Sequence, residues 1–286
     1  MSTSANPVLL DVAKVTAGFE VRSGWSEALH EVSFTVRKRE IVGLVGESGS
    51  GKSTAVRSVL GLLAAGGRVT GGSATLSCVD GPNQVDLMTC GPRRLRQIRG
   101  PQIGFVAQNP FSALNPVIRI RKQFAAIFKA HGLKFGAAER ERCVGMLAAT
   151  GIRDPERVID GYAFELSGGM AQRVVIAMAM VLEPSLVIAD EPTTALDLTV
   201  QRQVLDVFAE LTMANDRSAL IVTHDLAVVA NYCDRVIVML DGRVVEEGDV
   251  TQVLTAPRHT YTQHLLASAR GRTPDTNGEA VRHGVH

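Results

Sequence analysis

Eight residues between positions 46 and 54 carry the strongest chemical signal in the sequence. They are Gly46, Ser48, Gly49, Ser50, Gly51, Lys52, Ser53 and Thr54. Glycines let the backbone curl around an anion so that successive N–H groups face its oxygens, and a helix starting here adds partial positive charge. The lysine reaches the outer phosphates of a nucleotide, and the serine hydroxyl after it is a ligand for Mg²⁺. The pattern predicts a phosphate-binding loop (P-loop) for a nucleoside triphosphate. A flexible glycine turn, the alternative, does not account for the Lys-Ser pair.

Two adjacent carboxylates, Asp190 and Glu191, follow the apolar run at residues 186–189. In a protein with a P-loop, such a strand lies beside the loop, so we expect Asp190 to hold Mg²⁺ together with Ser53. Glu191 is then placed to orient or deprotonate the attacking water. The alternative is an acidic helix cap before Pro192, which the P-loop makes the weaker interpretation.

The segment at residues 166–173, Leu-Ser-Gly-Gly-Met-Ala-Gln-Arg, predicts a serine-glycine-glycine turn that opens a long helix. Such a turn is a second site suited to an anion, although a helix cap without a ligand has the same residues. The segment resembles the signature motif of ATP-binding cassette (ABC) ATPases. The other motifs of that family occur in order along the chain: the P-loop, Gln108, the signature, Asp190-Glu191, Ala195-Leu196-Asp197 and His224. The resemblance covers residues from about Leu9 to Leu254.

This resemblance implies a head-to-tail dimer of cassettes with two ATP molecules sandwiched between them and Mg²⁺ as the cofactor. Each ATP would contact the P-loop of one chain and the Ser167-Gly168-Gly169 turn of the other. Asp197 resembles the residue that crosses the dimer interface. The second cassette is expected to be a copy of this chain or a relative of it.

The resemblance also implies roles for single residues near the nucleotide. Phe19 matches the aromatic residue that stacks on adenine, with Trp25 as a nearby alternative. Gln108 matches the residue that senses Mg²⁺ and contacts the membrane partner. His224 matches the switch that contacts the γ-phosphate. With Glu191 and His224 both present, we expect a catalytically complete site.

Three phrases carry a finer resemblance to the importers of dipeptides, oligopeptides and nickel; they lie at residues 108–116, 164–170 and 257–263. In that branch separate transmembrane permease subunits carry the solute, which a periplasmic or extracellular solute-binding protein delivers. We therefore expect an ATPase at the cytoplasmic face of the plasma (inner) membrane that drives peptide uptake, with nickel or metallophore uptake as the alternative. Met170 stands where many family members carry glutamine, a departure that peptide importers often share.

The composition restricts the class of partner. With 30 basic and 29 acidic residues, the net charge of +1 gives no overall attraction to nucleic acid, which weakens the alternative of a soluble ABC ATPase acting on nucleic acid or ribosomes. An export cassette is a third, weaker alternative. The longest apolar run, Val174–Leu182, is far short of the ~20 residues that span a bilayer, so we expect other chains to supply the membrane spans.

Charge is unevenly distributed, because no acidic residue lies between Asp86 and Glu139. The basic residues of that stretch are Arg93, Arg94, Arg96, Arg99, Arg119, Arg121, Lys122, Lys129 and Lys134. This stretch either faces an acidic partner or anionic lipid, or is a solvated surface.

The elements that must position these residues follow from the hydrophobic pattern. A buried strand at 41–45 and a helix at 55–63 flank the P-loop, and strands at 102–107, 186–189 and 219–222 alternate with helices, which predicts a mostly parallel sheet. Half-buried strands are expected before residue 40, with Phe19 and Trp25 in the loop between them. Gly66-Gly67 and Gly71-Gly72 are expected to be turns around a strand from Ala74, and residues 81–83 a loop.

The predicted fold is an α/β P-loop NTPase of the ABC cassette type, with a mostly parallel RecA-like core, an antiparallel β subdomain and a helical subdomain. We assign residues 1–256 to the ATP-binding domain, with the helical subdomain at about 112–167. Residues 257–286 are expected to form a short C-terminal tail, partly disordered from about residue 270.

Overall fold

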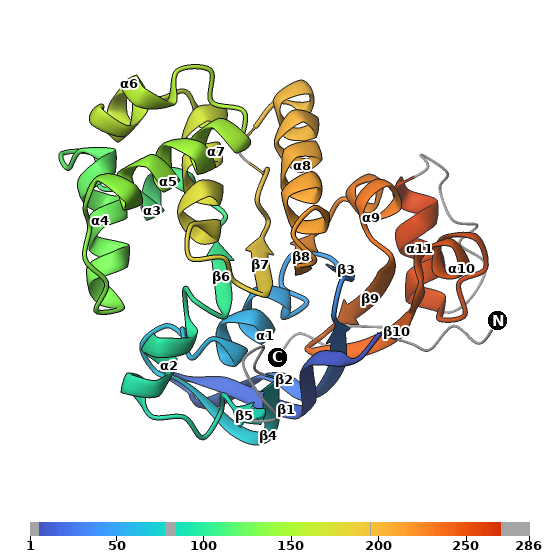
Figure 1. The fold of residues 1–286 in the computed structure, drawn as a ribbon. Coiled ribbons are helices and arrows are strands. Elements are labelled where there is room, and N and C mark those ends of the chain that lie inside the picture. The colour runs from blue at the N-terminus through green and yellow to red at the C-terminus, as the bar shows by residue number, and fades with distance from the viewer. Residues whose placement is uncertain (1–5, 78–83, 195, 270–286) are drawn as a thin grey trace.

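The computed structural model describes residues 6–77, 84–194 and 196–269. Two sheets pack together, a group of helices covers one side, and the two last helices cover the other (Figure 1). The strands are β1 (Val8–Val21), β2 (Gly24–Arg37), β3 (Ile41–Val45), β4 (Gly67–Ser77), β5 (Gln84–Asp86), β6 (Ile103–Val106), β7 (Leu186–Asp190), β8 (Ser218–Thr223), β9 (Arg235–Leu240) and β10 (Arg243–Asp249). The helices are α1 (Lys52–Val59), α2 (Pro92–Ile98), α3 (Pro110–Ala113), α4 (Ile120–Ala130), α5 (Ala137–Ala149), α6 (Pro155–Asp160), the 3₁₀ helix Ala163–Glu165, α7 (Gly168–Met180), α8 (Leu198–Met213), α9 (Leu226–Tyr232), α10 (Val250–Thr255) and α11 (Thr260–Ala269).

The larger sheet has six strands in the order β10-β9-β3-β8-β7-β6. All neighbours pair in parallel except β10, which forms an antiparallel hairpin with β9. Every residue of β3, β7 and β8 is buried, as in a sheet covered on both faces. The predicted parallel α/β core is therefore confirmed.

The smaller sheet is antiparallel, in the order β2-β1-β4-β5. The prediction that Phe19 and Trp25 lie in a loop is wrong, because β1 continues to Val21 and Phe19 pairs with Ser26 of β2. Several register shifts interrupt the alternation of polar and apolar residues along β1, so the period-2 pattern ends before the strand does.

Of the two glycine pairs predicted as turns, Gly66 lies in a turn as expected and Gly67 begins β4, whereas Gly71 and Gly72 lie inside β4. The register between β1 and β4 shifts next to Gly71, which pairs with Thr16. Gly72 has a φ of +90°, and a Cβ there would meet the backbone of Lys14 and Val15. Gly72 thus allows a bulge in which the backbones of β4 and β1 approach closely, rather than a reversal of the chain.

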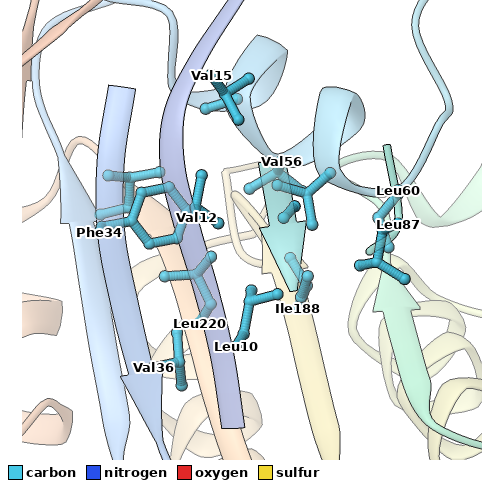
Figure 2. Close-up of a cluster of buried hydrophobic side chains, with 14 of the residues drawn as sticks. Leu10, Val12, Val15, Phe34, Val36, Val56, Leu60, Leu87, Ile188 and Leu220 are labelled. Carbon is cyan, nitrogen blue, oxygen red and sulfur yellow. The ribbon is translucent and has the colours of Figure 1, made fainter. Parts of the chain in front are cut away.

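The space between the two sheets is filled by one hydrophobic cluster (Figure 2). The cluster includes Val12 of β1 and Phe34 of β2 from the smaller sheet, Leu220 of β8 from the larger sheet, and Val56 of α1. Helix α1 ends at Val59, earlier than the expected residue 63, because Gly61 adopts a φ of +60°. The helix that starts at the P-loop is therefore anchored on both sheets.

The chain between β6 and β7 is helical, as expected, and forms the group α3–α7 on one side of the larger sheet (Figure 1). Phe124 and Phe128 of α4 are buried. On α5 the buried residues are Cys143 and Leu147.

Within the stretch assigned to the C-terminal tail, residues 260–269 form α11 and bury Thr262 and Leu266. The tail beyond Ala269 and the predicted loop at 81–83 lie outside the described residues. Within the described ranges, no helix is long and apolar enough to cross a membrane.

Candidate functional site

Strand order brings most of the predicted catalytic residues to one edge of the larger sheet. The neighbours β3, β8, β7 and β6 run parallel, so their carboxyl ends lie side by side. The P-loop follows β3, His224 follows β8, Glu191 follows β7 and Gln108 comes soon after β6. Ligands of open parallel sheets bind at this edge.

The P-loop wraps around its own lysine. Lys52, 4% exposed, begins α1, and its Nζ donates to the carbonyl oxygens of Gly46 (2.8 Å) and Glu47 (2.7 Å). Gly46 has a φ of +153°, and a Cβ there would meet the carbonyl oxygen of Met239, so only glycine fits. Burial lowers the pKa of Lys52, against the opposing effect of Glu191, Asp190 and Glu47.

Ser53 and Asp190 form the pair expected for Mg²⁺. Ser53 Oγ donates to Asp190 Oδ1 at 2.7 Å, and Arg57 Nη2 lies 3.3 Å from Asp190 Oδ2. Asp190 is 1% exposed, so the buried carboxylate is held on both oxygens by a hydroxyl and a guanidinium. Where phosphates supply part of its coordination shell, Mg²⁺ needs only a few oxygen ligands from the protein. One carboxylate and one hydroxyl are such ligands, so these residues fit the ion.

Glu191 is the centre of a second set of contacts. Its Oε2 accepts from Gln108 Nε2 and from Thr194 Oγ1, each at 2.9 Å, and His224 Nδ1 lies 3.5 Å from its Oε1. The residue adopts a φ of +48°, unusual for a residue with a side chain, and its N–H donates to Val222 of β8. The backbone thus turns sharply after β7 and aims the carboxylate at Gln108 and His224.

Glu191 and Gln108 border a cavity of about 460 Å³. Its lining residues are Glu27, Ala28, His30, Ser48, Gly49, Gly51, Lys52, Ser53, Thr54, Gln108, Glu191, Asp241 and Gly242. Of the residues predicted to act at the P-loop, Gly46, Ser50, Asp190 and His224 are not part of this lining. Phe19 is not in the lining; its ring lies against Gly67 of β4. Trp25 stacks with Arg68, 4.6 Å from its ring centroid.

The signature residues line a different cavity, of about 600 Å³. Ser167 caps α7 by accepting from Met170 N–H, and Gly168 and Gly169 form the first turn. Asp197, which caps α8, lies in the same lining. The two cavities have no lining residue in common, so one chain does not bring its P-loop and its signature together.

Sequence reasoning missed several residues that line the first cavity or contact Asp190 and Glu191. Arg57 and Thr194 had a local signal, since each lies within one turn of a predicted residue, Ser53 or Glu191. The lining residues from β2 and from the β9–β10 turn had no local sequence signal. They come together only because the two sheets pack, as the hydrogen bond from His30 N–H to the Gly242 carbonyl oxygen shows.

Part of the basic stretch is engaged within the chain. Arg99 donates to the carbonyls of Leu60 and Gly61, Arg121 pairs with Asp160, and Arg119 Nε donates to the Tyr162 hydroxyl. For the remaining exposed basic residues, a surface that faces an acidic partner or anionic lipid and a solvated surface both stay open.

Comparison with known proteins gives one consistent family. The family model described as ABC transporter matches residues 29–194. The peptidoglycan transport ATP-binding protein YejF of Agrobacterium fabrum is 43% identical over 96% of this chain, which spans only about half (50%) of that relative's length. The dipeptide transport ATP-binding protein DppD of Haemophilus influenzae is 40% identical over 91% of this chain and 77% of its own.

Solved structures agree with the fold. A dimeric bacterial ABC transporter cassette has a TM-score of 0.72 at 27% identity, covering 85% of this chain and 99% of that one. A dimeric cassette in a post-hydrolysis state with ADP and Pi has a TM-score of 0.73 at 26% identity, with the same coverage of 85% and 99%.

Proposed function

The chain belongs to the ABC transporter family of ATP-binding cassettes, and from this premise we propose that it hydrolyses ATP to drive the import of dipeptides or oligopeptides. The relatives named for dipeptide and peptidoglycan transport support this class of solute. Nickel or metallophore uptake is the second candidate, carried by the sequence resemblance to that branch.

The residues of the first cavity divide the reaction between them. The N–H groups of the P-loop and Lys52 bind the phosphates, while Ser53, Asp190 and Gln108 hold Mg²⁺. The ion supplies charge neutralisation for the phosphoryl group as it is transferred. Glu191 orients the attacking water and accepts its proton. Gln108 and Thr194 keep the Glu191 carboxylate in place, and His224 contacts the γ-phosphate.

A second cassette completes the site in this proposal. Ser167, Gly168 and Gly169 present the start of α7 in a cavity separate from the P-loop, which supports their contacting an ATP bound by the other chain. Asp197 would lie at that interface. The dimeric structures of related cassettes support the same arrangement.

The remaining partners follow from the role in import. They are two transmembrane permease subunits and a solute-binding protein that reaches the chain only through the complex. Nucleic acid is not among the proposed partners. The chain then acts as a peripheral subunit at the cytoplasmic face of the plasma membrane. We keep the division into an ATP-binding domain at 1–256 and a helical subdomain near 112–167 as part of this proposal.

One observation carries the proposal: Glu191, which contacts Gln108, Thr194 and His224, lines the same cavity as the P-loop residues. The test is the ATPase rate of the membrane complex purified through this chain, with loaded solute-binding proteins added in turn. We expect stimulation by a protein loaded with a dipeptide or oligopeptide. Stimulation only by a nickel- or metallophore-loaded protein would move the chain to the metal branch. Purification without permease subunits would contradict the transporter role.

A further inference from the structure

The first turn of α11 contacts the P-loop at a point that the catalytic residues do not use. The hydroxyl oxygen of Tyr261 accepts a hydrogen bond from the Glu47 N–H at 2.9 Å, across 214 positions of sequence. Glu47 directly follows Gly46, where the chain leaves β3 and enters the P-loop. In Figure 1, α11 lies beside α10, at the far side of the sheet from the helices α3–α7.

The position of Tyr261 is fixed by the residues just before it. Glu246 of β10, 8% exposed, accepts from the N–H groups of Arg258 (2.8 Å) and His259 (3.0 Å). Burial by itself raises the pKa of Glu246, but these N–H groups, the Thr262 side chain and the charge of His259 together bring the pKa below its ordinary value. His259 Nδ1 in turn accepts from the Tyr261 N–H at 3.2 Å, so it caps the helix.

The ring of Tyr261 is held as well as its hydroxyl. A hydrophobic cluster joins Val45, the last residue of β3, to Val238 of β9 and Val253 of α10, and Tyr261 and Leu265 of α11 pack against it. Burial raises the pKa of Tyr261. The side chain is therefore fixed by packing against the strand that leads into the P-loop.

Glu47 is restrained from both sides of its backbone. Its N–H donates to Tyr261, and its carbonyl oxygen accepts from Lys52 Nζ at 2.7 Å. Lys52 has to exchange such carbonyl contacts for phosphate oxygens when a nucleotide binds, whereas the Tyr261 contact lies outside the phosphate cradle. It can therefore persist in both states and keep the start of the loop in place.

We propose that Tyr261 is a positioning residue that holds the entry of the P-loop and so raises the affinity for MgATP. This inference rests on the proposed function. A loop whose entry is already fixed loses less conformational entropy when it closes on phosphates. One net hydrogen bond corresponds to a change of about 2- to 10-fold in affinity. The contact touches neither Glu191 nor His224, so the rate of the chemical step does not depend on it.

Tyr261→Phe tests the proposal because it removes only the hydroxyl and leaves the packed ring. Tyr232→Phe is the matched control. Its hydroxyl donates to Asp206 at 2.7 Å, also within the described chain, but that contact joins α9 to α8 away from the P-loop. Both variants lose one tyrosine hydroxyl and its hydrogen bonding, which for Tyr232 also includes the Arg202 carbonyl oxygen at 3.5 Å, so a general effect of such a loss on the fold is common to them.

The first readout is steady-state ATP hydrolysis by the complex purified through this chain. We expect the KM for MgATP to rise about 2- to 10-fold in Tyr261→Phe with kcat unchanged, and neither to change in Tyr232→Phe. Equal KM values for the two variants and the wild type would overturn the proposal.

The second readout is hydrogen exchange of the Glu47 amide in the full chain without nucleotide. We expect faster exchange at Glu47 in Tyr261→Phe and no change there in Tyr232→Phe. This measurement separates the two levels of inference. If the wild type does not bind MgATP, the proposed function fails while the exchange still tests the contact. If the Glu47 amide exchanges equally in both variants, the role of Tyr261 fails while the proposed function stands.

Discussion

Two helices of this chain begin with a turn suited to an anion, and their surroundings differ. At the start of α1, Lys52, Asp190 and Glu191 lie around the turn, and the Glu191 carboxylate accepts hydrogen bonds from the side chains of Gln108 and Thr194. At the start of α7, the carboxylates in the lining, Asp154 and Asp197, accept from backbone N–H groups and cap helices α6 and α8.

This difference indicates which of the two sites can carry out the chemical step and which can only contact a nucleotide. A carboxylate that caps a helix is already committed to the backbone, whereas Glu191 has rotatable side-chain partners that can yield to water and phosphate. We therefore expect the α1 site to carry nucleotide binding and the chemical step. The α7 site then affects turnover only through the nucleotide bound by another cassette.

The largest expected effect is at Glu191. Glu191→Gln keeps the shape of the side chain but removes the base, so hydrolysis by the complex should fall about 10²–10⁴-fold while ATP binding is retained. Turnover is measured by phosphate release and binding by equilibrium titration of the same preparation. Unchanged turnover would remove Glu191 from the role of base and would break the contrast between the two sites.

Lys52→Ala comes next, because it removes a charged contact to phosphate. ATP affinity should fall about 10- to 100-fold, in keeping with the strength of a hydrogen bond to a charged group. Titration of the full chain with MgATP measures this change. Lys129→Ala, at an exposed position of α4, is the control and should bind as the wild type does. Equal affinities for the two variants would place the phosphates elsewhere.

Ser167→Ala is expected to have the smallest effect of the three. Binding of MgATP by the single chain should be unchanged, while hydrolysis by the assembled complex falls about 5- to 10-fold, since one hydroxyl to the nucleotide is lost. Loss of the cap lowers the free energy of unfolding by about 1 kcal/mol. Asp249→Ala removes the cap of α10 and controls for that loss of stability. Weaker binding to the single chain would show that the two sites are not separate.

Both anion-suited turns could be predicted because their signals are local. A glycine that must adopt positive φ, a Lys-Ser pair opening a helix and a serine that caps one all act within a few residues. The run at residues 186–189 likewise identified β7 and placed Asp190 at its end. Along β1, bulges interrupt the period-2 pattern, so the pattern predicted too short a strand and wrongly assigned Phe19 to a loop.

Local residue patterns were enough to predict the P-loop, the signature turn, the carboxylate pair and the parallel sheet. Which of these lie together depends on how the strands and helices pack. Glu191 contacts Gln108 and His224 because β6 and β8 flank β7, an order that pattern reasoning leaves open. The same holds for the cavity wall from β2 and for Tyr261 at Glu47. Such contacts join residues far apart in sequence, and their partners are set by how sheets and helices pack rather than by any short stretch of chain.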